Sequence, residues 1–350
     1  MHAPGGVNRR LPPPPPPGYS RGSVDERAAG PTEMIFTYFD ERLNALPFLC
    51  VDGVVDGGLN LSHWPGNRTP AHLKADTSTE MALRLARDPA REDWLRGVSI
   101  VTNNHFDTDG LLSVFSVLRP DEALRHETGL IQAARTGDFG EFTTPDAFKL
   151  DCVVTAFGDE ERSPIAAEIR GLGEHERYQV IYDRLLSMLP GLLSSAASYK
   201  SLWSDRLAAY MKSMMRMRDV ARVREHEGAR LTVIEAAEPL DEMARFNVAR
   251  HHRVLTATKG PDGTFYEIAF QIFSWFDTVT PPRGGRFDLS GLAEELNRLE
   301  PPGAGRWTYT GDDSLESRLH RAGPGGEPVP SALPLEVLEP LVTRVFAARP

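Results

Sequence analysis

The chain has 350 residues, of which 41% are hydrophobic, and it carries a formal net charge of −10 at pH 7. This length allows two domains of ordinary size, and the apolar content is sufficient to build their cores. The negative charge argues against stable binding of duplex nucleic acid or anionic lipid through overall charge. Because no apolar stretch approaches the roughly 20 residues that span a bilayer, we expect no membrane segment.

The first 32 residues are rich in proline, with six consecutive prolines at 12–17. Such a run favours an extended backbone without hydrogen bonds, so we expect residues 1–32 to be a disordered leader. The leader lacks the apolar core of a secretory signal. Cys50 and Cys152 lie in apolar runs and are expected to be buried thiols rather than a disulfide. These features are typical of a cytoplasmic protein.

The next part of the chain alternates strands and helices. We expect strands at 34–40, 46–52 and 98–104, helices at 75–88 and 110–118, and a loop rich in Gly, Asn and Pro at 53–70. This order is typical of an α/β fold with a mostly parallel sheet and flanking helices. In such folds, ligands bind at the carboxyl ends of the strands.

The remainder predicts a helical middle region followed by a smaller α/β unit. Helical periodicity extends from about 120 to 228, and later strands and helices alternate around a hairpin turn with Asp-Gly at its tip, in KGPDGTF. The expected domains are the leader at 1–32, an α/β domain with a helical extension at 33–195, a long linking helix at 196–228 and a smaller α/β domain at 229–350.

A group of potential metal ligands follows the third predicted strand, in the sequence HFDTDG. His105, Asp107 and Asp109 occupy every second position, so an extended backbone points their side chains to the same side. Carboxylate and imidazole groups suit divalent Mg, Mn, Fe or Zn. The alternative is that the two aspartates only cap the helix beginning at Gly110, whose N-terminus also favours bound phosphate.

Two segments resemble the DHH phosphoesterase superfamily. One runs from the strand ending in Asp52 through SHWPGN to TSTEMA, and the other, HFDTDG, is similar to the family's His-x-Asp-x-Asp-Gly motif. In the Asp-His-His motif, Ser62 replaces the Asp and Trp64 the second His, so His63 alone remains. The family's His-x-Asp-x-Asp-Gly segment precedes this loop, whereas here it follows. Either the chain is a rearranged relative, or HFDTDG occupies the place of the family's later Asp-Thr-Gly motif and residues 34–43 have lost the first motif.

The resemblance implies a metal-dependent hydrolase. Its metal ligands would be Asp52, His63, His105, Asp107 and Asp109, of which His105, Asp107 and Asp109 would also be catalytic. The cofactor would be a divalent metal, manganese first, with Mg, Fe or Zn as alternatives. Two ions roughly 3.5–4 Å apart would activate a water for in-line attack on the phosphorus of a small phosphate ester or anhydride or of a short nucleotide. A non-catalytic DHH-like binding protein with a degenerate metal site is the alternative.

Residues 275–312 resemble the small substrate domain attached to many of these enzymes. The family's glycine-rich loop ends in Gly-His, whereas the loop PGAGRW carries Arg306 at that place. The resemblance implies that Arg283, Arg286 and Arg306 bind the substrate's phosphate or carboxylate. It also implies that Asn67, in the loop with His63, binds substrate. Solvated loop arginines are the alternative. The expected partner is therefore a small phosphorylated substrate, and the sequence is compatible with a homodimer.

Overall fold

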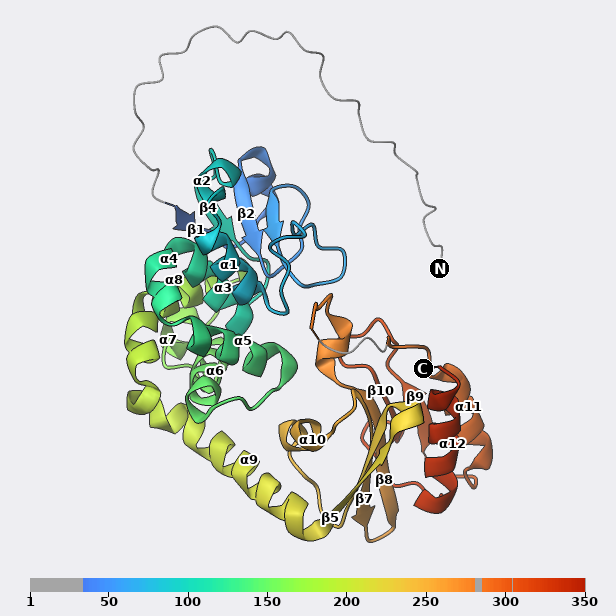
Figure 1. Cartoon of the computed structure of the whole chain (residues 1–350). Helices are drawn as coiled ribbons and strands as arrows, with labels where there is room; N and C mark the ends of the chain where they lie inside the picture. The colour runs from blue at the N-terminus through green and yellow to red at the C-terminus, as the bar shows by residue number, and fades with distance from the viewer. Residues whose placement is uncertain (1–33, 281–284, 304, 350) are drawn as a thin grey trace, which may run out of the picture. The chain divides into compact units, whose positions relative to one another are not determined.

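The computed structural model describes residues 34–280, 285–303 and 305–349. The predicted leader and Arg283 lie outside the described residues. The fold is α/β, as the sequence predicted, and it contains two sheets formed by different parts of the chain (Figure 1).

The first sheet has four parallel strands in the order β1-β4-β2-β3. They are β1 (Ile35–Phe36), β2 (Phe48–Val51), β3 (Leu59–Leu61) and β4 (Ile100–Thr102). The central strands β2 and β4 are buried along their whole length, as parallel strands usually are. In β2, Leu49 and Val51 join the main core, whereas Phe48 and Cys50 join a smaller cluster, because successive side chains point to opposite faces.

Strand β3 lies inside the segment 53–70, which was predicted to be a loop. It pairs with β2 through Leu49 and Leu59 and through Val51 and Leu61. The buried Asn60 donates hydrogen bonds to the carbonyls of Cys50, at 3.3 Å, and Gly53, at 2.9 Å. The strand therefore depends on contacts with β2, which the local composition does not reveal.

Helices pack against this sheet and form the middle of the chain. They are α1 (Ser78–Arg87), α2 (Arg91–Trp94), α3 (Thr108–Leu118), α4 (Pro120–Arg125), α5 (Glu127–Phe139), α6 (Pro145–Gly158), α7 (Ala166–Ile169), α8 (Glu174–Ser194) and α9 (Lys200–Val220). Thr77 caps α1 by accepting the N–H of Glu80 at 3.2 Å. Asp107 caps α3 by accepting the N–H of Gly110 at 2.8 Å. Because α1 and α3 also pack against each other, both helix N-termini are held at the same edge of the sheet.

Helix α9 ends at Val220, whereas the sequence predicted a linking helix that continues to 228. Residues Ala221–His226 instead form β5, which pairs antiparallel with β6. The alternation of Arg222, Val223 and Arg224 suits a charged edge strand. The division into domains at 33–195, 196–228 and 229–350 stays a prediction, and the second sheet already begins at Ala221.

The second sheet has six strands in the order β5-β6-β7-β8-β10-β9. Its other elements are β6 (Leu231–Ala236), α10 (Glu242–Val248), β7 (Arg253–Gly260), β8 (Gly263–Phe270), α11 (Ser290–Leu299), β9 (Arg306–Tyr309), β10 (Arg318–Ala322) and α12 (Leu335–Ala347). Strands β6 and β7 are parallel and the other pairs antiparallel. The predicted hairpin joins β7 and β8, and Leu296 of α11 and Val342 of α12 complete the core of this part.

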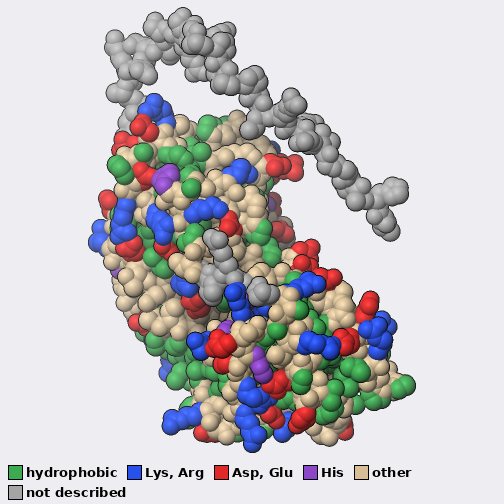
Figure 2. Space-filling view, turned by 45° about the vertical axis from the view of Figure 1, so that its right-hand side comes forward, with side chains coloured by type: hydrophobic (Ala, Val, Ile, Leu, Met, Phe, Trp, Pro, Cys, Tyr) green, Lys and Arg blue, Asp and Glu red, His purple; other side chains and the backbone are tan. Residues whose placement is uncertain are grey.

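The surface carries both signs of charge. Figure 2 shows one face of the protein, on which Lys and Arg side chains are interspersed with Asp and Glu side chains. Over 34–280, 285–303 and 305–349, no helix is both long enough and apolar enough to cross a membrane. Cys50 and Cys152 are free and buried, as the sequence predicted.

Candidate metal centre

Three loops that carry the predicted ligands meet at the carboxyl end of the parallel sheet. Asp52 directly follows β2, His63 follows β3, and the loop with His105 follows β4. Strand β2 pairs with both β3 and β4, so the ends of these strands are neighbours. The structure brings these five side chains together in two groups that share Asp52. Their assignment as metal ligands stays a prediction.

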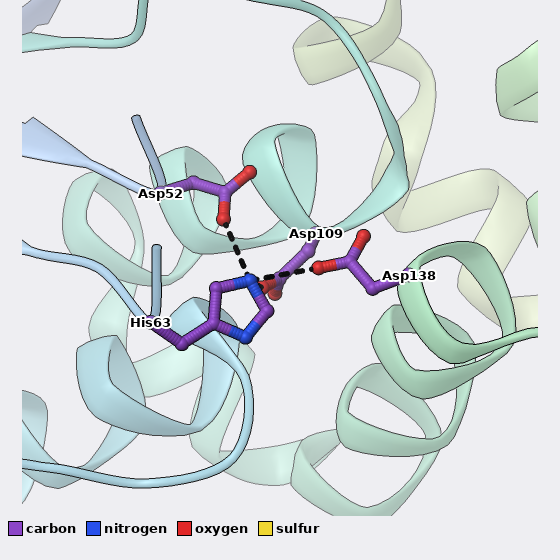
Figure 3. A group of neighbouring side chains, drawn as sticks. All are labelled: Asp52, His63, Asp109 and Asp138. Carbon is purple, nitrogen blue, oxygen red and sulfur yellow. Dashed lines mark ion pairs between the residues drawn. The ribbon is translucent and has the colours of Figure 1, made fainter. Parts of the chain in front are cut away.

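The deep group consists of Asp52, His63, Asp109 and Asp138, all of which are buried (Figure 3). Nε2 of His63 lies 3.4 Å from Oδ1 of Asp52, 3.6 Å from Oδ2 of Asp109 and 2.9 Å from Oδ2 of Asp138. Figure 3 shows the three carboxylates pointing toward one side of the imidazole ring. Four ligand atoms within 4.8 Å of one another can hold one divalent cation.

The shallow group consists of Asp52, His105 and Asp107. Nε2 of His105 lies 2.8 Å from Oδ2 of Asp52 and 3.0 Å from Oδ2 of Asp107. The side chains of His105 and Asp107 are 21% and 37% exposed, whereas that of Asp52 is fully buried. Solvent therefore reaches the centre from the side of the shallow group.

Asp138 was missing from the predicted ligands. It lies near the end of α5, outside every motif that the sequence offered. The sequence did contain one signal, because Asp138 continues the helical spacing of the apolar Leu130 and Ala134. The structure buries all three. A carboxylate that continues a buried apolar face needs a partner, and here His63 lies beside it.

The start of α1 orients two of the carboxylates. The backbone N–H groups of Ser78 and Thr79 each donate to Asp109 at 2.7 Å. The hydroxyl of Ser78 donates to Oδ1 of Asp52 at 2.8 Å. A helix N-terminus favours negative charge, so the sequence TST supplies donors that hold two adjacent anions in place.

His63 is oriented by the backbone of Asp76. Its Nδ1 lies 2.5 Å from the carbonyl oxygen of Asp76, which can only accept, so Nδ1 carries the proton of this hydrogen bond. Nε2 is then directed at the carboxylates. Such bonding of the second ring nitrogen is the usual way in which proteins orient a histidine ligand.

The clustered charges shift the pKa values of the group. Burial and the charge of Asp52 raise the pKa of Asp109 to about 7. Burial, together with the charges of Asp107 and Asp109, raises the pKa of Asp138 well above its ordinary value. Burial alone would lower the pKa of His63, but its interactions with the carboxylates of Asp138 and Asp52 outweigh that effect and raise it. A cation bound by these groups would compete with protons for the same atoms.

The two positions that depart from the DHH motif support the ligand loops instead of adding ligands. The Ser62 hydroxyl donates to the carbonyl of Asp52 and accepts the N–H of Trp64 at 3.0 Å. The Trp64 ring lies 4.6 Å from that of His105 and 5.3 Å from that of Trp275, between centroids. Both groups have at least three ligand atoms without these positions.

The residues predicted to bind substrate are placed differently. Asn67 donates to Asp277 at 3.1 Å, beside the loop that carries His63. The guanidinium of Arg286 donates to backbone carbonyls of two neighbouring loops, and burial lowers its pKa to about 10. Arg306 is exposed at the start of β9, and Arg283 lies outside the described residues. Arg286 is therefore already bonded within the protein, and the substrate-binding roles stay predictions.

Comparison with known proteins identifies a family. The model of DUF6687, a family of unknown function, matches residues 32–350. The chain belongs to this family. A comparison with curated proteins found no match. Among solved structures, the chain is similar to PggH, a pGpG-specific phosphodiesterase from Vibrio cholerae, with 12% identity and a TM-score of 0.36 over 85% of this chain and 82% of that chain.

Proposed function

We propose that the protein is a metal-dependent hydrolase that cleaves a phosphate ester or anhydride of a small molecule or short nucleotide. The observation that carries the proposal is the pair of ligand groups joined by Asp52, one buried and one open to solvent. Oxygen and imidazole ligands in these numbers suit Mn, Mg, Fe or Zn, and manganese is the first choice to test. The resemblance of HFDTDG and TSTEMA to DHH phosphoesterase motifs favours phosphoryl chemistry.

Two buried atoms support the fit of a cation to the deep group. Nε2 of His63 and Oδ2 of Asp138 are only 2.9 Å apart, yet neither has a hydrogen-bond partner with good geometry. Buried polar atoms normally have such a partner. A divalent cation bound by this group would satisfy both atoms and offset the repulsion among the carboxylates.

The positions of the side chains determine which ion each of them would bind. Oδ1 of Asp52 faces the deep group and Oδ2 the shallow group, so this carboxylate would hold two ions next to each other. The deep ion would be held by His63, Asp109 and Asp138 as well, and the shallow ion by His105 and Asp107. Bound cations would supply Lewis-acid stabilisation of phosphoryl oxygens and a water of lowered pKa.

A substrate would reach the centre beside His105 and Asp107, the two partly exposed members. Helix α3 begins there, and the N–H groups at a helix N-terminus favour bound phosphate. Because the chain has a net charge of −10, the cations themselves would provide much of the attraction for an anionic substrate. A small phosphorylated compound is therefore the expected partner.

Metal content and phosphatase activity of the purified protein test the proposal. We expect two divalent ions per chain after loading with Mn²⁺, and hydrolysis of a phosphodiester, pyrophosphate or a dinucleotide that EDTA abolishes. Asp107→Asn/Asp109→Asn should lose the shallow ion and the hydrolysis and bind the deep ion more weakly. Asp56→Asn/Asp262→Asn, which changes two exposed aspartates, should leave metal content and hydrolysis intact. A folded wild-type protein that binds no metal under any loading would refute the proposal. Metal binding without any hydrolysis would favour the non-catalytic binding protein.

A further inference from the structure

A segment from the C-terminal half of the chain contacts the deep group. It comprises residues 276–280, which follow the short 3₁₀ helix η4 (Ile272–Trp275), and we call it the strap. The ring of Phe276 stacks on the imidazole of His63, with centroids 4.1 Å apart and an interplanar angle of 26°. The N–H of Asp277 donates to the carbonyl of His63 at 2.7 Å. The strap thus contacts both the ring and the backbone of one potential ligand.

The strap also binds Asp76, two residues before α1. The Asp76 carboxylate accepts the N–H groups of Val279 and Thr280, both at 2.9 Å, and the hydroxyl of Thr280. Arg135 of α5 donates to the same carboxylate at 2.9 Å. The Asp76 side chain is 3% exposed. Burial opposes ionisation, but these hydrogen bonds outweigh it and lower the pKa of Asp76, so the carboxylate stays charged and bonded.

Asp76 links the strap to two sides of the deep group. Its carbonyl accepts the Nδ1 proton of His63, and its carboxylate binds Arg135, which lies one helical turn before Asp138 on α5. Movement of Asp76 would therefore change the separation of His63 and Asp138 across the group. That separation decides whether both side chains reach the same cation.

We propose that the strap is a positioning element, whose docking on His63 and Asp76 sets the geometry in which His63 and Asp138 bind a cation. This inference rests on the proposed metal-dependent function. Because coupling between two binding events is reciprocal, cation binding also stabilises the docked strap. Residues that orient metal ligands without touching the metal typically change its affinity by about 10–100-fold. Loss of the strap contacts is expected to have an effect in this range.

Two variants of the full-length chain test the coupling without removing a ligand. Thr280→Val deletes the hydroxyl that binds Asp76, and Asp76→Asn removes the charge while keeping the carbonyl that orients His63. Thr308→Val makes the same Thr-to-Val change at an exposed position of β9 and serves as the matched control. By calorimetric titration with Mn²⁺, we expect about tenfold weaker binding in the two strap variants and unchanged binding in the control. In the wild type, Mn²⁺ should slow amide hydrogen exchange of residues 276–280.

The outcomes separate this inference from the function on which it rests. A wild-type protein that binds no Mn²⁺ would overturn both. The positioning role alone would be overturned if the wild type binds Mn²⁺ but both strap variants bind it with the same affinity and Mn²⁺ does not change the amide hydrogen exchange of residues 276–280. If Asp76→Asn does not fold, Thr280→Val and the exchange of the wild-type strap decide the question.

Discussion

Substitution of Asp52 is the change that best tests whether the centre holds two ions. Asp52 supplies one oxygen to each group, so Asp52→Asn removes a negative charge from both and keeps the shape of the side chain. The shallow group then retains only His105 and Asp107, fewer than the three protein ligands that catalytic metal sites commonly use. We expect the shallow ion to be lost.

The deep group keeps His63, Asp109 and Asp138 after this substitution, so its ion should remain with reduced affinity. The reduction should be at least about tenfold, since even residues that only orient a ligand change metal affinity by about 10–100-fold. The Ser78 hydroxyl lies 2.8 Å from Oδ1 of Asp52. The amide oxygen of the Asp52→Asn variant can still accept this hydroxyl, which should preserve the local fold.

Elemental analysis after gel filtration, together with Mn²⁺ titration, measures both effects. The expected ion count falls from two to one in Asp52→Asn. Asp107→Asn should lose only the shallow ion. Asp109→Asn/Asp138→Asn leaves two deep ligands, Asp52 and His63, and should lose only the deep ion, so these two variants provide the reference ion counts. Retention of two ions with wild-type affinity in Asp52→Asn would refute the shared-carboxylate geometry. Loss of the same single ion in all three variants would show one site instead of two.

Three further substitutions test other parts of the structure. Arg286→Gln should lower the free energy of unfolding by about 2 kcal/mol, because the backbone carbonyls that accept from the guanidinium lose their donor, and it should leave the KM for the substrate unchanged. A raised KM at unchanged stability would show instead that Arg286 binds the substrate. Burial lowers the pKa of His252 from 6.5 to about 3 in the folded protein. The contribution of the neutral histidine to the free energy of unfolding is therefore fully present above pH 6.5 and is lost as the pH falls toward 3. In urea unfolding, the wild type should therefore lose about 2 kcal/mol more stability than His252→Phe between pH 7 and pH 5. Equal losses in the two proteins would contradict this. Thr77→Ala should lower the free energy of unfolding by about 1 kcal/mol through loss of the α1 cap. In the same assay, Thr308→Ala at an exposed position should lower it by no more than about 0.5 kcal/mol.

The α/β class and the location of the centre followed from local patterns. Apolar runs of strand length end just before Asp52 and His105, and parallel strands bring such ends to one edge of a sheet. The spacing of His105, Asp107 and Asp109 predicted side chains on one side of an extended loop. Helix α3 begins at Thr108, however, so Asp109 turns into the deep group while the other two stay in the shallow group.

The sequence by itself thus determined the kinds of potential ligand and the edge of the sheet where they meet. The tertiary structure decided that they form two groups sharing Asp52, that Asp138 of α5 completes the deep one, and that the strap contacts it. Asp76 and Thr280 are 204 residues apart in the chain. Contacts over such separations cost loop-closure entropy that only the packing of a whole core offsets, so no local pattern reveals them.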